Sequence, residues 1–286
     1  MATAPKSLVK QIRSLLDRLV SSRRLSNDEQ EVIGDAVLGE AAKLPREGVL
    51  DALDKAVGSS KKRRSEAVYV LSQLTDTAEV VDRIREWLKD PDPRWRSWLI
   101  QTVEQRGLTE FAPLLNQIIE HDPDPFCRGL AVHAAGTLRA DENLPVLLRL
   151  AKRVDHQGTW RFAWALKGYA RPTCRPYLTK WFKDEKQDKQ TRIVAAWGLG
   201  KLGDLKALNF LVQMLFDPDR EGKTFFNPGE SRRAAQALCD IEGWPFKWDK
   251  SYVTKTIARV KKSERLQSFL APFLAASDSK ADASAP

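Results

Sequence analysis

The chain has 286 residues, of which 42% are hydrophobic and 30% charged, and its formal net charge at pH 7 is +9. No apolar stretch reaches the roughly 18 residues that a membrane-spanning helix needs, and the N-terminus lacks the apolar run of a secretory signal. Three cysteines without metal-like spacing, Cys127, Cys174 and Cys239, are typical of a reduced, intracellular chain. We therefore expect a cytoplasmic protein without membrane insertion or bound metal.

The first predicted element is a helix near the N-terminus. Across residues 6–22, leucine and isoleucine side chains recur at helical spacing, while the opposite face is basic. We interpret residues 1–25 as an N-terminal capping helix, because arrays of stacked helices need a polar-faced end. A helix that lies on a membrane surface is the alternative. Ser26 and Glu29 then form a helix-start signal, which opens the main body at residues 26–276.

From about residue 60 the sequence repeats itself with a period of 32 residues. The anchor positions of five copies are Arg64, Arg96, Arg128, Trp160 and Arg192. An alanine or leucine stands three residues after each anchor, and a glycine stands eight residues after each of the last three. A period of roughly 20 to 50 residues marks a solenoid, in which each unit buries its apolar side against its neighbours.

Each unit contains two predicted helices. The segment after each anchor helix again has helical spacing, as in the run from Leu208 to Leu215, and none of these segments alternates as a strand would. An Asp-Pro-Asp-Pro turn precedes Arg96 and again Arg128. Since proline ends one helix and is tolerated in the first turn of the next, this turn joins two antiparallel helices. The sequence thus predicts an all-α fold, a right-handed α-solenoid of about six to seven antiparallel helix pairs.

The motif Arg-x-x-Ala-Ala-x-Gly-Leu-Gly-x-Leu-Gly-Asp from Arg192 to Asp204, together with these turns, resembles the HEAT-repeat family, especially the short bacterial HEAT-like repeats also seen in phycobilisome lyases. The resemblance implies that turn aspartates and anchor arginines form a ladder between neighbouring repeats. It also implies that the helix after each anchor lines the concave side. The ladder residues implied in this way are Asp92, Arg96, Asp124, Arg128 and Arg192. Trp160 departs from the pattern, so the ladder is broken or shifted there.

If the anchor helices line the concave side, the residues one, five and nine positions after each anchor face the groove. There the middle and C-terminal repeats offer cations beside aromatic rings. The candidate binding residues at these positions are His133, Arg161, Tyr169, Trp197, Lys201 and Arg232. Trp197 is the sharpest candidate, because glutamine, histidine and alanine hold the same offset in other repeats. Packing over the neighbouring helix is its alternative interpretation.

The 32-residue spacing of the repeat is not kept after Leu215. The next aligned helix begins near Ser231, seven residues late, so residues 217–230 contain an insertion. Insertions in repeat proteins fall in loops, which often bind ligands. Phe225 and Phe226 in this loop are therefore candidates for contact with a partner, or alternatively for packing back onto the array. Residues 277–286 are small and polar, and are predicted to be a disordered tail.

The excess of positive charge lies entirely after residue 120, where Lys and Arg outnumber Asp and Glu by 28 to 19. The leading hypothesis is a scaffold or adaptor that binds a protein partner through a concave, C-terminally basic groove. The charge also favours an alternative, a nucleic-acid-binding protein that uses its concave face as HEAT-like DNA glycosylases do. A protein similar to the phycobilin lyases is a third reading, which rests on the resemblance alone.

Catalytic motifs are absent from the sequence. It contains no Gly-rich phosphate loop, nucleophile elbow or Cys-Cys metal pair. The three histidines, His121, His133 and His156, lack the paired His-Glu motifs that a resemblance to deoxyhypusine hydroxylases would require. We expect no cofactor, and the sequence disfavours an enzyme without excluding one. The identity of the partner and the oligomeric state are left open.

Overall fold

The computed structural model describes residues 5–45, 48–58, 60, 62–63, 66–67, 70, 78–105, 107–154, 156–216, 229–247 and 251–270. Helices dominate these residues, and no β-strand occurs among them, which confirms the prediction of an all-α fold. The chain divides into two compact units, Met1–Ala134 (unit 1) and Ala135–Pro286 (unit 2), and each is described by itself.

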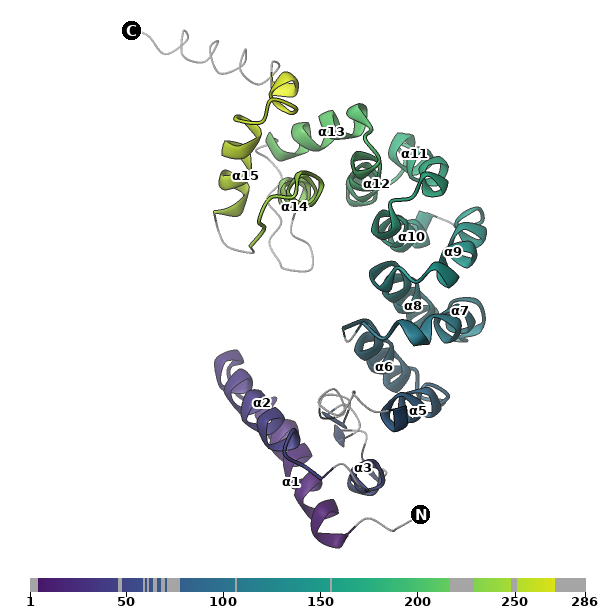
Figure 1. Ribbon diagram of the computed structural model, residues 1–286, viewed down its shortest axis with the longest axis vertical. Helices are drawn as coiled ribbons and strands as arrows, with labels where there is room; N and C mark the ends of the chain where they lie inside the picture. The colour runs from purple at the N-terminus through teal and green to yellow at the C-terminus, as the bar shows by residue number, and fades with distance from the viewer. Residues whose placement is uncertain are drawn as a thin grey trace. The chain divides into compact units, whose positions relative to one another are not determined.

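Unit 1 contains the purple to blue helices of Figure 1. They are α1 (Lys6–Ser22), α2 (Asn27–Ala41), α3 (Val49–Val57), α5 (Ala78–Trp87), α6 (Pro93–Gln105), the 3-10 turn η1 (Thr109–Phe111) and α7 (Ala112–His121). The helix α8 (Pro125–Leu138) contains the division between the units. The leucine and isoleucine side of α1 is buried, and α1 packs against α2 and α3. Ser26 and Glu29 form a capping box at the start of α2, so that the first free amide groups of this helix are satisfied.

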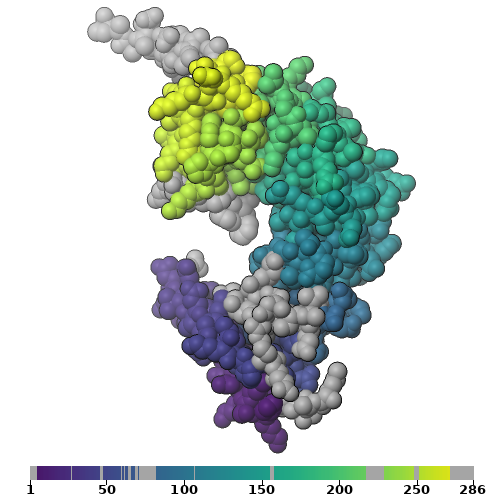
Figure 2. All heavy atoms as spheres, viewed as in Figure 1, coloured from purple at the N-terminus to yellow at the C-terminus, as the bar shows by residue number. Residues whose placement is uncertain are grey.

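Unit 2 contains the remaining helices. They are α9 (Leu144–Ala151), α10 (His156–Tyr169), α11 (Arg175–Lys183), α12 (Lys189–Lys201), α13 (Leu205–Phe216), α14 (Glu230–Glu242) and α15 (Tyr252–Val260), with the 3-10 turns η2 (Asp141–Asn143), η3 (Pro172–Cys174) and η4 (Gln267–Leu270). α10, α12 and α14 form one row of neighbouring helices, and α9, α11 and α13 form a second row beside it (Figure 1). α12 contacts both its row neighbours and two helices of the second row. Side chains fill the space between the ribbons, as the teal to yellow spheres of Figure 2 show.

The repeated glycines explain how closely the helices of the first row approach one another. A Cβ atom added to Gly168 would lie 2.2 Å from the carbonyl oxygen of Gly136, and one added to Gly136 would lie 2.3 Å from the Cα of Ala165. A Cβ added to Gly200 would lie 2.6 Å from the Cδ1 of Ile241. All three glycines stand eight residues after an anchor. At Gly136 and Gly168 this sequence position is the point at which the backbones of α8 and α10 meet with no room for a side chain, whereas at Gly200 the neighbour is the end of the Ile241 side chain.

A buried ion pair joins successive repeats in unit 1. The Arg96 guanidinium donates to both carboxylate oxygens of Asp122 at 2.7 and 2.8 Å, and the side chains are only 8% and 5% exposed. Arg96 also donates to the carbonyl oxygens of Asp90 and Pro91. The pair with Asp122 raises the pKa of Arg96. Each of the three guanidinium nitrogens thus donates to an oxygen, which is what a charge needs when it is removed from water.

The other ladder residues implied by the resemblance make different contacts. Asp124 accepts a hydrogen bond from the backbone amide of Cys127 at 2.8 Å at the start of α8, and Asp92 accepts one from the amide of Arg94 at 3.0 Å. Both aspartates therefore act as helix caps. Arg128 donates to the carbonyl oxygens of Asp122 and Pro123, and Arg192 donates to that of Phe182. The carboxylate that joins two repeats belongs to Asp122, the first aspartate of its turn and not the second.

Candidate binding site on the α10, α12 and α14 row

Aromatic and charged side chains gather in unit 2 where α10, α12 and α14 adjoin. We call it the Lys167 cluster and define it as Trp164, Lys167, Trp197, Arg233 and Asp240. The Lys167 Nζ atom lies 3.8 Å from the ring centroid of Trp164 and 3.9 Å from that of Trp197. The two indoles meet edge to face, with centroids 5.7 Å apart and planes at 84°. One amine is thus held by two indole rings from different helices.

Helix periodicity and a glycine bring these groups together. Trp164 and Lys167 are three residues apart on α10, so they share a face of the helix. On α12, a Cβ added to Gly198 would lie 3.2 Å from the Cα of Lys167. The backbone of α12 therefore passes directly beside Lys167, and the adjacent Trp197 reaches the amine from the second side.

Asp240 of α14 fixes the position of the second indole. Its Oδ2 atom accepts hydrogen bonds from Trp197 Nε1 at 2.7 Å and from Lys201 Nζ at 3.0 Å. Burial alone would raise the pKa of Asp240, but the bonds from Lys201 and Trp197 and the charge of Lys167 outweigh it, so the pKa is lowered. Asp240 is consequently an anion that ties α12 to α14.

Lys167 is in an unusual electrostatic environment. Burial is the main cause that lowers the pKa of its amine, to about 7. The carboxylate of Asp240 opposes this shift, and the positive charges of Lys201, Arg233 and Arg139 add to it. Among the residues that the structure describes, no carboxylate or carbonyl oxygen accepts a hydrogen bond from Nζ, whose contacts are the two indole rings.

Arg233 is a second cation beside the same ring, and it is partly buried. Its Cζ atom lies 5.3 Å from the centroid of Trp164, and burial lowers its pKa. Its guanidinium donates to the side-chain oxygens of Gln190 at 3.5 Å and Gln236 at 3.4 Å. Within the described part of the chain no carboxylate forms an ion pair with it. Two partly desolvated cations therefore contact the Trp164 ring, and no carboxylate of the described residues forms an ion pair with either of them.

The edge of the cluster adds aromatic surface. Trp160, one turn before Trp164 on α10, stacks on it with centroids 5.9 Å apart and planes at 29°. Both rings are partly exposed. A ligand that reaches Lys167 or Arg233 would therefore also contact flat apolar surface.

Of the candidate residues predicted from the sequence, two belong to this region. Trp197 is in the Lys167 cluster, where it is only 3% exposed and packs against α10, and Lys201 is bonded to Asp240 at its edge. Arg161 and Arg232 lie on α10 and α14 and are partly buried; burial lowers the pKa of Arg161. Phe225 and Phe226 lie outside the described residues.

The structure differs from the sequence-based expectation at Tyr169, which was predicted to face the groove. The Tyr169 side chain is buried, and its hydroxyl donates toward the carbonyl oxygens of Ala135 and Ala140 at 3.1 and 2.7 Å. Burial raises the pKa of this phenol. Tyr169 is the last residue of α10, and its hydroxyl reaches one carbonyl group in the last turn of α8 and another just after that helix, so the side chain turns inward and does not face the groove. His133 belongs to unit 1, where its Nδ1 atom lies 2.8 Å from a carboxylate oxygen of Glu104.

Sequence reasoning did not single out Lys167, Arg233 or the role of Asp240. The sequence does contain one indication for Lys167, which lies seven residues after the anchor Trp160. In the other four repeats that position holds Leu71, Val103, Ala135 and Leu199. A lysine at an otherwise apolar position of the repeat predicts a charge in an apolar environment.

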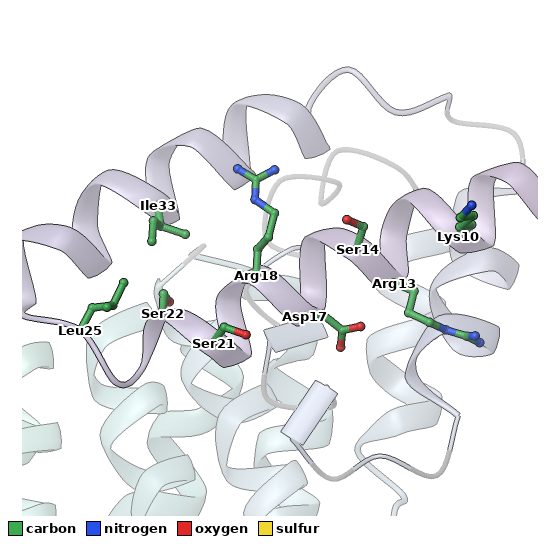
Figure 3. A pocket seen from close by; sticks show the side chains of 9 residues that line it. All are labelled: Lys10, Arg13, Ser14, Asp17, Arg18, Ser21, Ser22, Leu25 and Ile33. Carbon is green, nitrogen blue, oxygen red and sulfur yellow. The ribbon is translucent and has the colours of Figure 1, made fainter.

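Unit 1 contains a separate hollow of about 680 Å³ beside α1 (Figure 3). Leu25 and Ile33 lie at one end, and the Arg18 side chain points toward α2, where it pairs with Glu40 at 2.7 Å. Asp17 on the same helix pairs with Arg63 at 2.7 Å. Since these charges have partners within the unit, the hollow is a weaker candidate than the Lys167 cluster.

In the described part of the chain, every helix is too short or too polar to span a lipid bilayer. No group of three or more His, Cys, Asp or Glu side chains there is placed to hold a metal ion.

Comparison with known families supports the repeat interpretation. A family model for HEAT repeats matches residues 46–136, 81–167 and 144–223, which together cover more than half of the chain. The match includes α10 and α12 and ends before α14, which supplies Arg233 and Asp240. No curated protein shows a significant match.

Proposed function

Because the chain belongs to the HEAT-repeat family, we propose that it is a non-enzymatic binding scaffold whose α10, α12 and α14 row grips an acidic segment of a protein partner. The family and the helical repeat fold are the observations from which the proposal starts. We propose the existence of the partner, its acidic character and the face that binds it.

The proposal depends on one observation, the pair of partly desolvated cations, Lys167 and Arg233, at the Trp164 ring. A buried charge without a counter-ion is unfavourable, because it has lost its hydration and gained no equivalent partner. Lys167 and Arg233 both have lowered pKa values, and both have a cation–π contact to the same ring. A carboxylate brought by a ligand would supply the missing counter-ion to either group.

Charge and aromatic content over the whole row favour the same partner. The cations of this row are Arg161, Lys167, Lys201, Arg232 and Arg233. Asp240 is already bonded to Trp197 and Lys201. Tryptophan and arginine are the residue types enriched at protein–protein interfaces, where buried rings provide affinity and charges provide selectivity. An acidic segment with aliphatic or aromatic residues would complement both properties.

The test compares two charge reversals on the full chain. Arg233→Glu introduces an anion into the Lys167 cluster, whereas Lys206→Glu makes the same change on α13 in the other row, at an exposed residue. Each immobilised variant is exposed to a cell extract, and captured proteins are quantified by mass spectrometry. We expect a set of acidic proteins that wild type and Lys206→Glu retain and Arg233→Glu loses. Capture that is the same for all three proteins would refute the proposed face.

Nucleic acid is a second candidate ligand, and the stacked rings of Trp160 and Trp164 favour it. Base stacking on aromatic rings next to arginine is how many proteins hold single strands. Electrophoretic mobility shifts with single-stranded and duplex DNA at two salt concentrations test this class. Binding driven by phosphates should weaken steeply as salt rises, and the absence of any shift in dilute buffer would remove nucleic acid from consideration.

A further inference from the structure

We propose that a small cavity between α14 and α15 binds the phosphate group of a phosphate monoester, while two aromatic rings contact the body of the ligand. This site is separate from the Lys167 cluster, and it does not depend on the protein partner proposed above.

The cavity lies where α15 packs against α14, in the C-terminal part of unit 2 (Figure 1). Its volume is about 170 Å³. Because roughly 10–15 Å³ admits one water molecule, a cavity of this size holds a ligand of several heavy atoms. The described residues that line it come from the last turn of α14, from the segment 245–247 and from one face of α15.

The spacing of residues along α15 brings its lining side chains together. Tyr252, Lys255, Thr256 and Arg259 are separated by three or four residues, so they share one face of the helix. The Arg259 guanidinium also donates to the carbonyl oxygen of Pro245 at 2.8 Å. This bond ties the segment after α14 to α15, so one of the lining cations also helps to close the cavity.

The charged side chains among the described residues that line the cavity are all cations, namely Lys247, Lys255 and Arg259. Within the described part of the chain no carboxylate forms an ion pair with Lys247 or Arg259. The surrounding sequence is also basic, since residues 244–265 contain seven Lys and Arg against two Asp and Glu, which is +5 of the net +9. The potential at this cavity therefore favours an anion with more than one charge.

A phosphate monoester matches this set of donors. Near pH 7 it carries a charge of about −1.5 to −2 and three strong acceptor oxygens, and both lysine and arginine bind such oxygens through charge-assisted hydrogen bonds. The neutral polar groups of the lining bond within the protein: the Thr256 hydroxyl donates to the carbonyl oxygen of Tyr252 at 2.8 Å, and Cys239 Sγ lies 3.4 Å from that hydroxyl. Charged donors therefore dominate the recognition of a ligand.

Two aromatic rings line the same cavity as the cations. Phe246 and Tyr252 meet edge to face, with centroids 5.1 Å apart and planes at 74°. A flat or apolar ligand body would bury surface against these rings while its phosphate meets the cations. The ligand class that fits both features is a phosphate monoester of an aromatic or apolar alcohol.

The experiment measures binding of three probes to the full chain by isothermal titration calorimetry at pH 7.5. Phenyl phosphate has a ring and a doubly charged anion, phenyl sulfate has the same ring and a single charge, and inorganic phosphate has no ring. We expect phenyl phosphate to bind about 10-fold more tightly than phenyl sulfate and about 5-fold more tightly than inorganic phosphate. Equal affinities for phenyl phosphate and phenyl sulfate, or no binding of phenyl phosphate, would overturn the proposal. Inorganic phosphate that binds as tightly as phenyl phosphate would refute the contact with the rings.

A matched pair of variants locates the binding. Lys255 and Lys261 are both exposed and lie on α15 or directly after it, but only Lys255 lines the cavity. Lys255→Gln should weaken the binding of phenyl phosphate about 10-fold, and Lys261→Gln should weaken it less than about 2-fold. Equal losses would show that the ligand responds to the general charge of the segment and would refute the cavity as its site. Circular dichroism checks that both variants keep the wild-type fold.

The two proposals of function can fail separately. The cavity and the Lys167 cluster have no residue in common, and the calorimetry needs no protein partner. The capture experiment with Arg233→Glu decides the scaffold proposal, whereas phenyl phosphate binding with Lys255→Gln decides this one.

Discussion

Trp197 of α12 donates its indole N–H to Asp240 of α14 across 2.7 Å, and the ring is only 3% exposed. The same carboxylate oxygen accepts from Lys201, so one aspartate satisfies a buried donor and a surface cation together. This hydrogen bond fixes the position of the Trp197 ring, the second of the two indoles that contact Lys167. The first prediction tests its contribution to stability.

Asp240→Ala should lower the free energy of unfolding by about 1–3 kcal/mol, because it leaves the buried indole N–H of Trp197 without an acceptor. Urea denaturation followed by circular dichroism gives the value. Glu185→Ala is the control, since this exposed side chain has no hydrogen bond or ion pair to the described residues, and it should change stability by less than about 0.5 kcal/mol. A loss that is no larger for Asp240→Ala than for Glu185→Ala would contradict the structural role of the bond.

Gly168→Ala should be destabilising although alanine is the better helix former. Its Cβ would lie 2.2 Å from the carbonyl oxygen of Gly136, so α8 and α10 would have to separate, at a cost of about 1–3 kcal/mol or more. Gly39→Ala on α2 is the matched control, because nothing lies within 4 Å of its Cβ position. That control should stabilise the protein by about 0.5–1 kcal/mol. Thermal melting of both variants checks the opposite signs.

Asp122→Ala should destabilise the protein much more than Asp124→Ala. Removing Asp122 leaves the buried Arg96 cation without its carboxylate, which costs about 3–5 kcal/mol. Asp124 caps α8, and loss of a helix cap costs about 1 kcal/mol. Urea denaturation of the two variants under the same conditions measures the difference. Equal losses would mean that the ladder does not depend on the buried pair.

Lys167→Met should change how stability depends on pH. The folded-state pKa of Lys167, about 7, lies below the roughly 10.4 of an unfolded lysine, so between these values the unfolded chain binds one proton more than the folded chain. This lysine therefore makes wild type more stable as pH rises from 7 toward 10. The unfolding free energy of wild type minus that of Lys167→Met should increase between pH 7 and pH 9, as measured by urea titration. A difference that stays constant would contradict the lowered pKa.

The repeat could be predicted from the sequence because its signal is redundant. Five anchors at a constant spacing and glycines at a fixed offset specify helix pairs and their close approach, and the helices and glycine contacts of unit 2 agree with that register. The residues of the candidate binding site are not repeated along the sequence, so no periodic pattern identifies them. Lys167, Arg233 and Asp240 each occur once, on three helices, and only the packing brings them together.

The structure differs from the prediction at two places, Tyr169 and the turn aspartates, because the spacing of the repeat does not specify where a side chain points or which hydrogen bonds it forms. The offset rule assigned Tyr169 to the groove, but at this helix end the side chain turns inward, and its hydroxyl donates to the carbonyl oxygens of Ala135 and Ala140. The turn motif contains two aspartates, and spacing does not tell which of them reaches an arginine. Asp124 is engaged by the amide of Cys127, so Asp122 remains to bind Arg96.

The contact between Gly168 and Gly136 has a mechanical consequence for unit 2. Where two side chains meet, a change of rotamer can absorb a small displacement, but here a backbone carbonyl faces a backbone carbon and neither can rotate away. The spacing of α8 and α10 is therefore set at this point by backbone atoms and not by the choice of side-chain rotamers.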